Sequence, residues 1–288
     1  FMAAQEKLKN IGVVPFAFPN SKPGDFNYSW TSRILTEELI EDRYPELDAS
    51  GNGFIELNEY VRGVDLGIID IEQPPYSEMH PFIKEWSRYW PQGYNGLSLE
   101  AADEMFLREE AAMVMRTSAQ SKVLFESSAR GFEMGSFPLP YLTTENHPDA
   151  GNKLMEIGGV PAGNLAIPTS TPEGKREAAV AFLLYAVSPE AQGLMADKLY
   201  RAPVTDNAAL PEKLSGFTFV GEQMKLNIYS GEIDKNVTEN NQKLGQLYLE
   251  GSLSLEDYLK QLKAVMLEGV ERMKAENGWS KENNYGIK

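Results

Sequence analysis

Apolar residues recur at helical spacing over much of the chain, and short apolar runs of strand length separate these segments. The clearest helical pattern runs from Ser254 to about Ala275, where one apolar stripe follows a Ser254 cap. A strongly apolar stretch from Ala178 to Ala186 predicts another helix, with Pro172 as its first residue. Stripes of this kind are typical of helices that pack into a core.

Helices and short strands alternate along the rest of the sequence. Residues 13–18 and 111–115 are short apolar runs, which are typical of buried strands. Helical spacing predicts further helices over residues 31–44, 58–64, 77–89, 98–106 and 120–128, and from Pro189 onward. This alternation predicts an α/β chain.

Composition narrows the class of protein. At 288 residues, with 42% apolar and 24% charged residues, the chain has the composition of a folded protein with two lobes of ordinary size. Its formal net charge of -15 opposes binding to phosphate backbones and anionic membrane surfaces, so no nucleic acid partner is expected. No cysteine is present, which excludes disulfides, thiolate zinc sites and iron–sulfur clusters.

The two histidines, His80 and His147, each precede a proline. A residue before proline is biased away from helix, so we expect both in surface loops. With only these two imidazoles, neither a Ser-His-Asp relay nor a histidine metal cluster is expected. The phosphate-binding pattern G-x-x-x-x-G-K-[ST] is absent as well.

The first nine residues have the pattern of the middle of an amphipathic helix, without a cap ahead of it. We therefore expect the natural N-terminus to lie further upstream. No apolar run reaches the roughly 18 residues of a membrane span, and no basic and apolar leader opens the sequence.

The most specific motif is a calcium-binding loop of the EF-hand type at residues 48–59. Gly53 stands where such a loop turns sharply, and Ile55 stands where its apolar anchor is usual. Ca²⁺ takes about six to eight oxygen ligands, and this order of residues supplies an oxygen at each ligand position of the loop. Five side chains and one backbone carbonyl make up the predicted ligand set, namely Asp48, Ser50, Asn52, Glu56 and Glu59, with the carbonyl of Phe54.

A second interpretation of this loop remains open. It is a solvated turn that caps the following helix, in which Asp48 or Asn58 only accepts hydrogen bonds from backbone amides. Helix-forming segments on both sides, at residues 31–44 and 58–64, favour the calcium loop. Because sensors pair two loops, a single loop predicts a structural calcium ion.

Motifs spread over nearly the whole chain follow one another in a familiar order. They are the helix, turn and Pro-Phe strand of residues 1–18, F-L-R-E-E-A-A-M at 106–113, F-P-L-P at 137–140, the glycine-rich stretch at 158–168, S-P-E-A-Q at 188–192, R-A-P-V at 201–204 and the helix start at 251–259. This order resembles the extracellular solute-binding proteins of bacterial ABC importers, family 1, the maltose-binding-like, sugar-binding group. The calcium loop is similar to the EF-hand-type inserts of some members.

The resemblance implies a periplasmic-binding-protein-like fold of type II, with two α/β lobes that close on a sugar. Residues 1–158 and 205–288 would form the C-terminal lobe, with the EF-hand-like loop at 48–59. Residues 159–204 would be a returning segment of the N-terminal lobe. Two helices cannot bury their apolar faces alone, so the missing part of that lobe is expected upstream or in a separate chain.

The resemblance also implies where a ligand binds. Asn27, Tyr28 and Trp30 correspond to the loop and helix start that face the cleft, where aromatic rings stack on a pyranose and amides bind its hydroxyls. Arg116 and Ser118 follow a strand after which the family often has glycine and tryptophan. Here those positions carry threonine and alanine, so we expect Arg116 or Ser118 to meet a polar or anionic group.

The expected function is non-enzymatic binding of an oligosaccharide or other glycan for an ABC importer, by lobe closure and docking on the transporter permease. The expected cofactor is one structural Ca²⁺, in a loop that stiffens the C-terminal lobe beside Trp30. The expected location is extracytoplasmic, in the periplasm or as a lipoprotein on the surface of a bacterium. A calcium-dependent protein-interaction module and a glycoside hydrolase remain as alternatives.

Overall fold

The computed structural model describes residues 1–22, 27–152, 154–156, 165–205, 207–217, 223–225 and 233–288. The chain divides into two compact units. Unit 1 consists of Phe1–Val114, Pro140–Val160 and Gln223–Lys288, and unit 2 consists of Met115–Leu139 and Pro161–Glu222. The chain therefore crosses from one unit to the other at four points. The expected lobe boundary at residues 158 and 159 lies outside the described residues.

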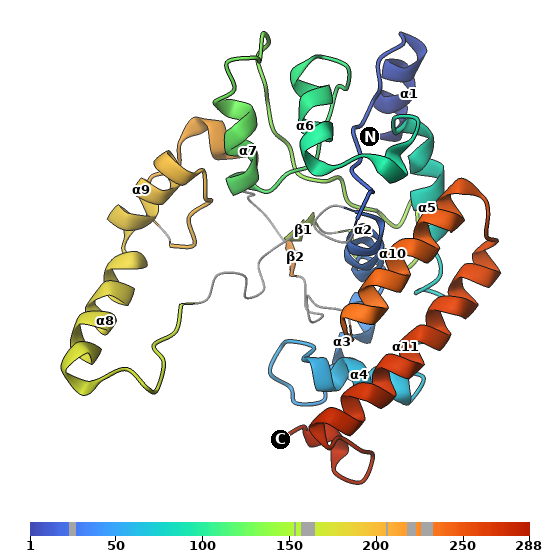
Figure 1. The fold of residues 1–288 in the computed structure, drawn as a ribbon, viewed down its shortest axis with the longest axis vertical. Helices are drawn as coiled ribbons and strands as arrows, with labels where there is room; N and C mark the ends of the chain where they lie inside the picture. The colour runs from blue at the N-terminus through green and yellow to red at the C-terminus, as the bar shows by residue number, and fades with distance from the viewer. Residues whose placement is uncertain (23–26, 153, 157–164, 206, 218–222, 226–232) are drawn as a thin grey trace. The chain divides into compact units, whose positions relative to one another are not determined.

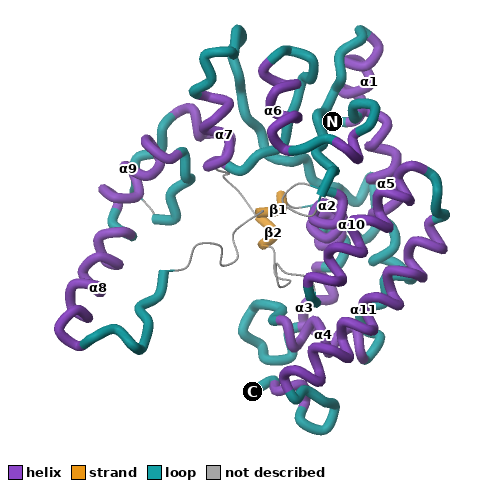
Figure 2. The backbone as a smooth tube through the Cα atoms, viewed as in Figure 1, coloured by secondary structure: helices purple, strands orange, loops and turns teal. Residues whose placement is uncertain are grey.

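Unit 1 is mainly helical, as Figures 1 and 2 show, and its last two helices pack against each other. Its α-helices are α1 (Met2–Asn10), α2 (Tyr28–Glu37), α3 (Tyr44–Leu47), α4 (Leu57–Asp65), α5 (Met79–Trp86), α6 (Leu99–Leu107), α10 (Lys235–Glu250) and α11 (Leu255–Asn277). Short 3₁₀ turns lie between them at η1 (Glu41–Arg43), η2 (Ser87–Tyr89) and η3 (Tyr94–Gly96), and another, η5 (Asn284–Gly286), follows α11.

Strands are few among the described residues. β1 (Leu154–Glu156) pairs in parallel with β2 (Gln223–Lys225), with Met155 opposite Met224. The two predicted strands at residues 13–18 and 111–115 run side by side, but only through isolated parallel bridges from Val14 to Ala111 and from Ala17 to Val114. Pro15 lies between the two bridges and has no N–H, so a continuous ladder cannot form there.

The helix boundaries follow their caps. The Ser254 hydroxyl accepts the N–H of Asp257 at 3.0 Å, which confirms the predicted cap of α11. The helix expected over 31–44 begins earlier, at Tyr28, because Asn27 caps its first turn, and it ends at Glu37. The polar sequence of α10 did not predict a helix. In the structure, Asp234 caps α10 by accepting the N–H of Val237 at 2.8 Å.

Aromatic side chains form much of the core of unit 1. Phe18 and Trp90 stack with ring centroids 3.7 Å apart, and Trp86 packs edge-on against Phe16 at 5.0 Å. The expectation of a surface loop for His80 is wrong, because it lies in α5, is 5% exposed and hydrogen-bonds Tyr28. The following proline falls in the first turn of α5, where a missing N–H costs no intrahelical bond.

Unit 2 contains α7 (Ser118–Phe125), α8 (Glu173–Ala186), α9 (Pro189–Leu199) and the 3₁₀ segment η4 (Glu212–Phe217). The predicted start of α8 is one residue early, since Pro172 stands at its N-cap position. A small core forms where α7, α9 and η4 meet, from Ala196, Tyr200 and Leu214 with Phe125 and Phe217 against them. No single described helix is long and apolar enough to cross a membrane; α8 and α9 pass that test only together, with a 66° bend between them.

Candidate functional site

The start of α2 holds the three residues predicted to contact a ligand from unit 1. Asn27 is 1% exposed, and its side-chain oxygen accepts the N–H of Trp30 at 3.0 Å. Its side-chain nitrogen donates to the carbonyl of Lys22 at 2.7 Å. Trp30, on the first turn of the helix, is half-buried. Asn27 is thus a helix cap that fixes the backbone of Trp30.

Tyr28 lies in the core rather than on a surface. Its side chain is 0% exposed, and its hydroxyl lies 2.7 Å from Nδ1 of His80. Burial raises the pKa of Tyr28 well above its ordinary value and lowers that of His80 to about 4, so both are neutral over a wide pH range. No face of the Tyr28 ring is open to a sugar in this structure.

A buried network of amide hydrogen bonds connects Asn20 and the start of α2 to α10. The Gln242 side chain donates to the backbone carbonyl of Asn20 at 2.9 Å and to its side-chain oxygen at 2.8 Å. It also accepts the N–H of Ser29 at 3.2 Å. Gln242 is a residue that sequence reasoning missed, and no local signal marks it because its partners lie more than 200 positions away. The network fixes Asn20 and the first turn of α2 against α10.

The two predicted ligand residues of unit 2 lie next to each other at the start of α7. Arg116 is 9% exposed and donates to the backbone carbonyl of Met115. Ser118 is the first residue of α7, and its hydroxyl accepts the N–H of Ala202 at 3.2 Å. Both side chains therefore take part in the internal structure of unit 2.

The predicted calcium loop forms a tight turn between α3 and α4. Gly53 has a φ of 87°, a conformation that favours glycine, and Ile55 is 1% exposed as the predicted anchor. The Asp48 carboxylate accepts the N–H of Asn52 at 3.1 Å and of Gly53 at 2.8 Å. These contacts close the loop around an acidic side chain.

Glu59 lies at the other end of the loop and is 0% exposed. Its two oxygens accept the N–H groups of Ser50 at 2.7 Å and Glu56 at 2.9 Å. The predicted ligands are all oxygens, which fits a hard divalent cation. The same hydrogen bonds also fit the turn interpretation, and Asn58 accepts the N–H of Glu59 at 3.0 Å as that interpretation expects. Phe54 offers its backbone carbonyl while its side chain is 45% exposed.

A different group of potential metal ligands lies on unit 1. Atoms of Glu78, His147 and Asp149 lie within 4.8 Å of one another. His147 Nδ1 accepts the N–H of Asp149 at 3.2 Å, and His147 Nε2 lies 3.0 Å from a Glu78 carboxylate oxygen. A metal would need the lone pair of Nε2, which in this structure lies at ion-pair distance from the Glu78 carboxylate.

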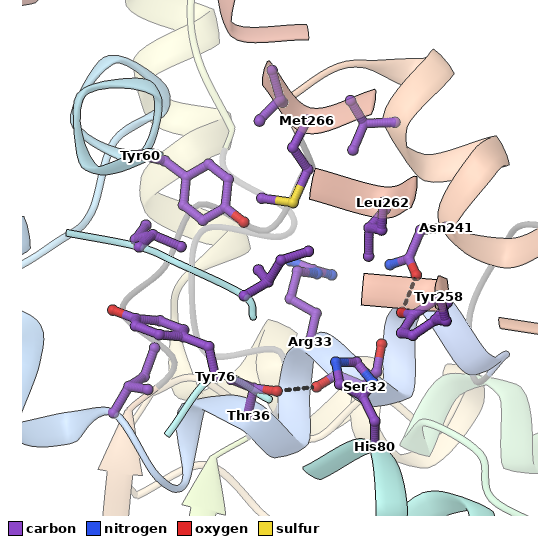
Figure 3. A pocket seen from close by; sticks show the side chains of 15 residues that line it. Ser32, Arg33, Thr36, Tyr60, Tyr76, His80, Asn241, Tyr258, Leu262 and Met266 are labelled. Carbon is purple, nitrogen blue, oxygen red and sulfur yellow. Dashed lines mark hydrogen bonds between the residues drawn. The ribbon is translucent and has the colours of Figure 1, made fainter. Parts of the chain in front are cut away.

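A pocket of about 80 Å³ opens in unit 1 between α2, α10 and α11. Figure 3 shows Asn241 and Tyr258 on one wall, joined by a hydrogen bond of 2.8 Å, and Ser32 and Thr36 of α2 on another. An engineered apolar cavity of about 150 Å³ holds benzene. At about 80 Å³ this pocket is smaller, so its size does not favour it as the binding site of a sugar ring.

Comparison with known proteins supports the fold. No family model and no curated protein matches the sequence. A solved structure described as a chitin oligosaccharide binding protein matches 94% of this chain with a TM-score of 0.60 and 16% identity. A sugar transporter from Bacillus licheniformis, solved in complex with stachyose, matches 94% with a TM-score of 0.53 and 17% identity. This chain spans 64% and 65% of the length of those two chains.

At such low identity, these matches show a shared fold and nothing finer. The expectation of a solute-binding fold is supported over nearly the whole chain. The division into two α/β lobes of type II, with the residue ranges given above, stays a prediction, since short strands form little of the described structure.

Proposed function

We propose that this chain is part of a carbohydrate-binding protein of the solute-binding class. The observation that carries the proposal is the fold that 94% of the chain shares with a chitin oligosaccharide binding protein and with a sugar transporter bound to stachyose. The proposal extends to an extracytoplasmic, non-enzymatic component of an ABC importer that presents an oligosaccharide to a permease. Its affinity would come from closure of two lobes on the ligand.

Trp30 is the residue to which we assign sugar stacking. An indole face stacks on the apolar side of a pyranose, and the backbone of Trp30 is fixed by the Asn27 cap. Asn27 and Tyr28 then act as positioning residues, because both are buried and hydrogen-bonded inside unit 1. Arg116 and Ser118 are proposed as polar contacts from unit 2.

The experiment titrates chitin oligosaccharides and stachyose against the protein, with tryptophan fluorescence and saturation-transfer NMR as readouts. We expect binding by at least one saccharide and a loss of about tenfold in affinity in Trp30→Ala, since one stacking contact disappears. Arg33→Ala, on the same helix, is the matched control and should bind as the parent does. Absence of any saccharide signal in a folded protein would contradict the proposal.

We further propose that the loop at residues 48–59 holds one structural Ca²⁺. Support comes from the complete oxygen order and from the buried Glu59 carboxylate at the last ligand position. A calcium ion bound only to the folded state stabilises it by about 2.7 kcal/mol at a hundredfold excess over Kd. We expect Ca²⁺ to raise Tm in the parent protein and to have no effect on Tm in Glu59→Gln.

The matched control is Glu56→Gln, because position nine of such loops often binds through water and tolerates loss of charge better. Comparison of Tm with and without Ca²⁺ inside each variant separates metal binding from the hydrogen bonds that Glu59 makes to backbone amides. If Ca²⁺ leaves Tm of the parent unchanged, the loop is the capping turn of the second interpretation.

A further inference from the structure

Three side chains of unit 1, Glu78, His147 and Asp149, bring an imidazole and two carboxylates together from two separate segments of the chain. One ligand atom of each residue lies within 4.8 Å of the other two. His147 Nε2 is 3.0 Å from Oε2 of Glu78, and His147 Nδ1 is 4.0 Å from Oδ2 of Asp149. The proposed sugar contacts and the loop at residues 48–59 include none of these residues.

The Glu78 oxygen that faces His147 is a buried acceptor. No described group donates a hydrogen bond of ordinary geometry to Oε2, although this atom is shielded from water. Burial of a carboxylate oxygen is unfavourable unless a proton donor or a cation lies beside it. At 3.0 Å, His147 Nε2 is close enough to bind the same cation as this oxygen. The lone pairs of both atoms therefore meet at one point.

The segment that carries His147 and Asp149 is attached to unit 1 by contacts of its backbone. At one end, the Leu142 N–H donates to the Glu38 carboxylate at 2.8 Å. At the other end, the Gly151 N–H donates to the backbone carbonyl of Glu38 at 3.3 Å. These two hydrogen bonds hold the segment in place without the side chains of His147 and Asp149, as a preorganised ligand site requires.

The ligand set determines which metal fits. Ca²⁺ and Mg²⁺ take oxygen ligands, whereas an imidazole nitrogen suits transition metals such as Zn²⁺. Three protein ligands with a water molecule in the fourth position form many zinc sites. We propose that Glu78, His147 and Asp149 form a Zn²⁺ site that fastens segment 142–151 to the start of α5.

The distances need only small adjustments to accept the ion. Two ligand atoms about 2.1 Å from a tetrahedral Zn²⁺ lie about 3.4 Å apart. The separation of 3.0 Å between His147 Nε2 and the Glu78 oxygen is close to this value. The side chain of Asp149 is 53% exposed, so it can rotate toward the metal.

Zinc binding changes the His147 ring in one defined way. In this structure, Nδ1 accepts the Asp149 N–H at 3.2 Å. When Nε2 binds the metal, the neutral ring carries its proton on Nδ1, so this contact has to open. The hydrogen bonds of Leu142 and Gly151 to Glu38 do not involve the ring and remain. The tautomer of His147 is thus a direct readout of the site.

The test adds Zn²⁺ to the 288-residue protein, purified without an affinity tag, in the presence of excess Ca²⁺. The Ca²⁺ competes for the loop at residues 48–59, whose ligands are all oxygens. Isothermal titration calorimetry measures stoichiometry and affinity. We expect one Zn²⁺ per chain and a higher Tm, because a ligand that binds only the folded state stabilises it.

Matched variants locate the ion. His147→Gln and Glu78→Gln should each weaken Zn²⁺ binding by at least about tenfold, since loss even of a residue that supports a metal ligand typically costs that much. Glu145→Gln, an exposed residue of the same segment, should bind as the parent does. Glu59→Gln, in the loop at 48–59, should also keep Zn²⁺ binding. Tm of each variant without Zn²⁺ checks that it is folded.

NMR of the imidazole nitrogens gives a second, independent readout. The chain has two histidines, and His80 is buried in the core, so it serves as the internal control. We expect Zn²⁺ to shift the His147 signals to the form with the proton on Nδ1 and to leave those of His80 unchanged.

Three results would overturn the proposal: no Zn²⁺ binding by the parent, equal affinity in His147→Gln, or weak binding of several ions per chain that the variants do not change. The last of these would show adventitious binding only. No saccharide enters the measurements, so their outcome is independent of the proposed sugar binding.

Discussion

A single carboxyl group, that of Glu38, couples the stability of unit 1 to pH. Glu38 is 4% exposed, and burial raises its pKa to about 7, against the opposing effect of the Leu142 N–H that it accepts at 2.8 Å. The folded-state pKa lies above the ordinary value of 4.5. The stability that this group contributes is therefore complete below pH 4.5 and is lost as the pH rises through about 7.

We expect Glu38→Gln to remove this pH dependence, because an amide oxygen still accepts the Leu142 N–H and carries no charge. The raised pKa of Glu38 corresponds to a change of about 3 kcal/mol in the free energy of unfolding between the acid and the neutral end of this pH range. Urea unfolding of parent and variant at several pH values measures it. His80 acts in the opposite direction, because burial lowers its pKa to about 4 and the stability that it contributes is lost as the pH falls. This effect is the same in the parent and in Glu38→Gln. Identical pH slopes would contradict the prediction.

At the residue scale, local motifs could be predicted from the sequence, whereas the burial of single side chains could not. The turn at residues 48–59, with its glycine conformation and buried Ile55, follows from the order of residues within twelve positions. Tyr28 and His80 lie 52 positions apart, and nothing nearby in the sequence indicates that their side chains meet in the core. That pairing depends on the packing of α2 against α5.

Packing between α2 and α10 depends on a glycine. A Cβ built on Gly245 would lie 2.0 Å from Cδ1 and 2.3 Å from Cε1 of Tyr28. Because both helices are fixed by other contacts, we expect Gly245→Ala to destabilise unit 1 by about 1–3 kcal/mol or more. Gly174→Ala in α8 is the control: nothing lies within 4 Å of that position, and alanine should be neutral or stabilise by up to about 1 kcal/mol. Equal unfolding midpoints for the parent and Gly245→Ala would show that the helices move apart without cost.

Elements with a strong pattern could be predicted, and weakly patterned ones could not. α11 has a cap, an apolar stripe and a terminal glycine, all of which are local. α10 carries three asparagines among its first seven residues, and its buried side includes Asn241 and Gln242, so no apolar stripe marks it. Only isolated bridges form between the predicted strands near Val14 and Ala111, because Pro15 interrupts the first of these segments.

For the whole molecule, the two units are expected to unfold separately. All four tryptophans, Trp30, Trp86, Trp90 and Trp279, belong to unit 1. Unit 2 has a small core and a bare α8 helix, so it should lose its structure first. We expect far-UV circular dichroism to begin its change at a lower urea concentration than tryptophan fluorescence. Coincident transitions would indicate one cooperative unit instead.

The order of motifs along the chain predicts the overall fold better than any single element does. Matches over 94% of the chain to two solved structures support the expectation of a solute-binding fold. The assignment of residues to lobes depends on how the chain folds back on itself, which no periodicity encodes. Charge and composition argue against partners such as nucleic acid but do not identify the glycan.

The interleaved order of the two units has a consequence for the nascent chain. Asn20 is held by Gln242, and Tyr28 packs beside Gly245, so the packing of residues translated early depends on residues translated last. On the ribosome, all of unit 2 in this sequence is translated before α10 and α11 emerge. Tyr28 and Asn20 therefore leave the exit tunnel before their partners in α10 exist, and their final packing depends on completed translation.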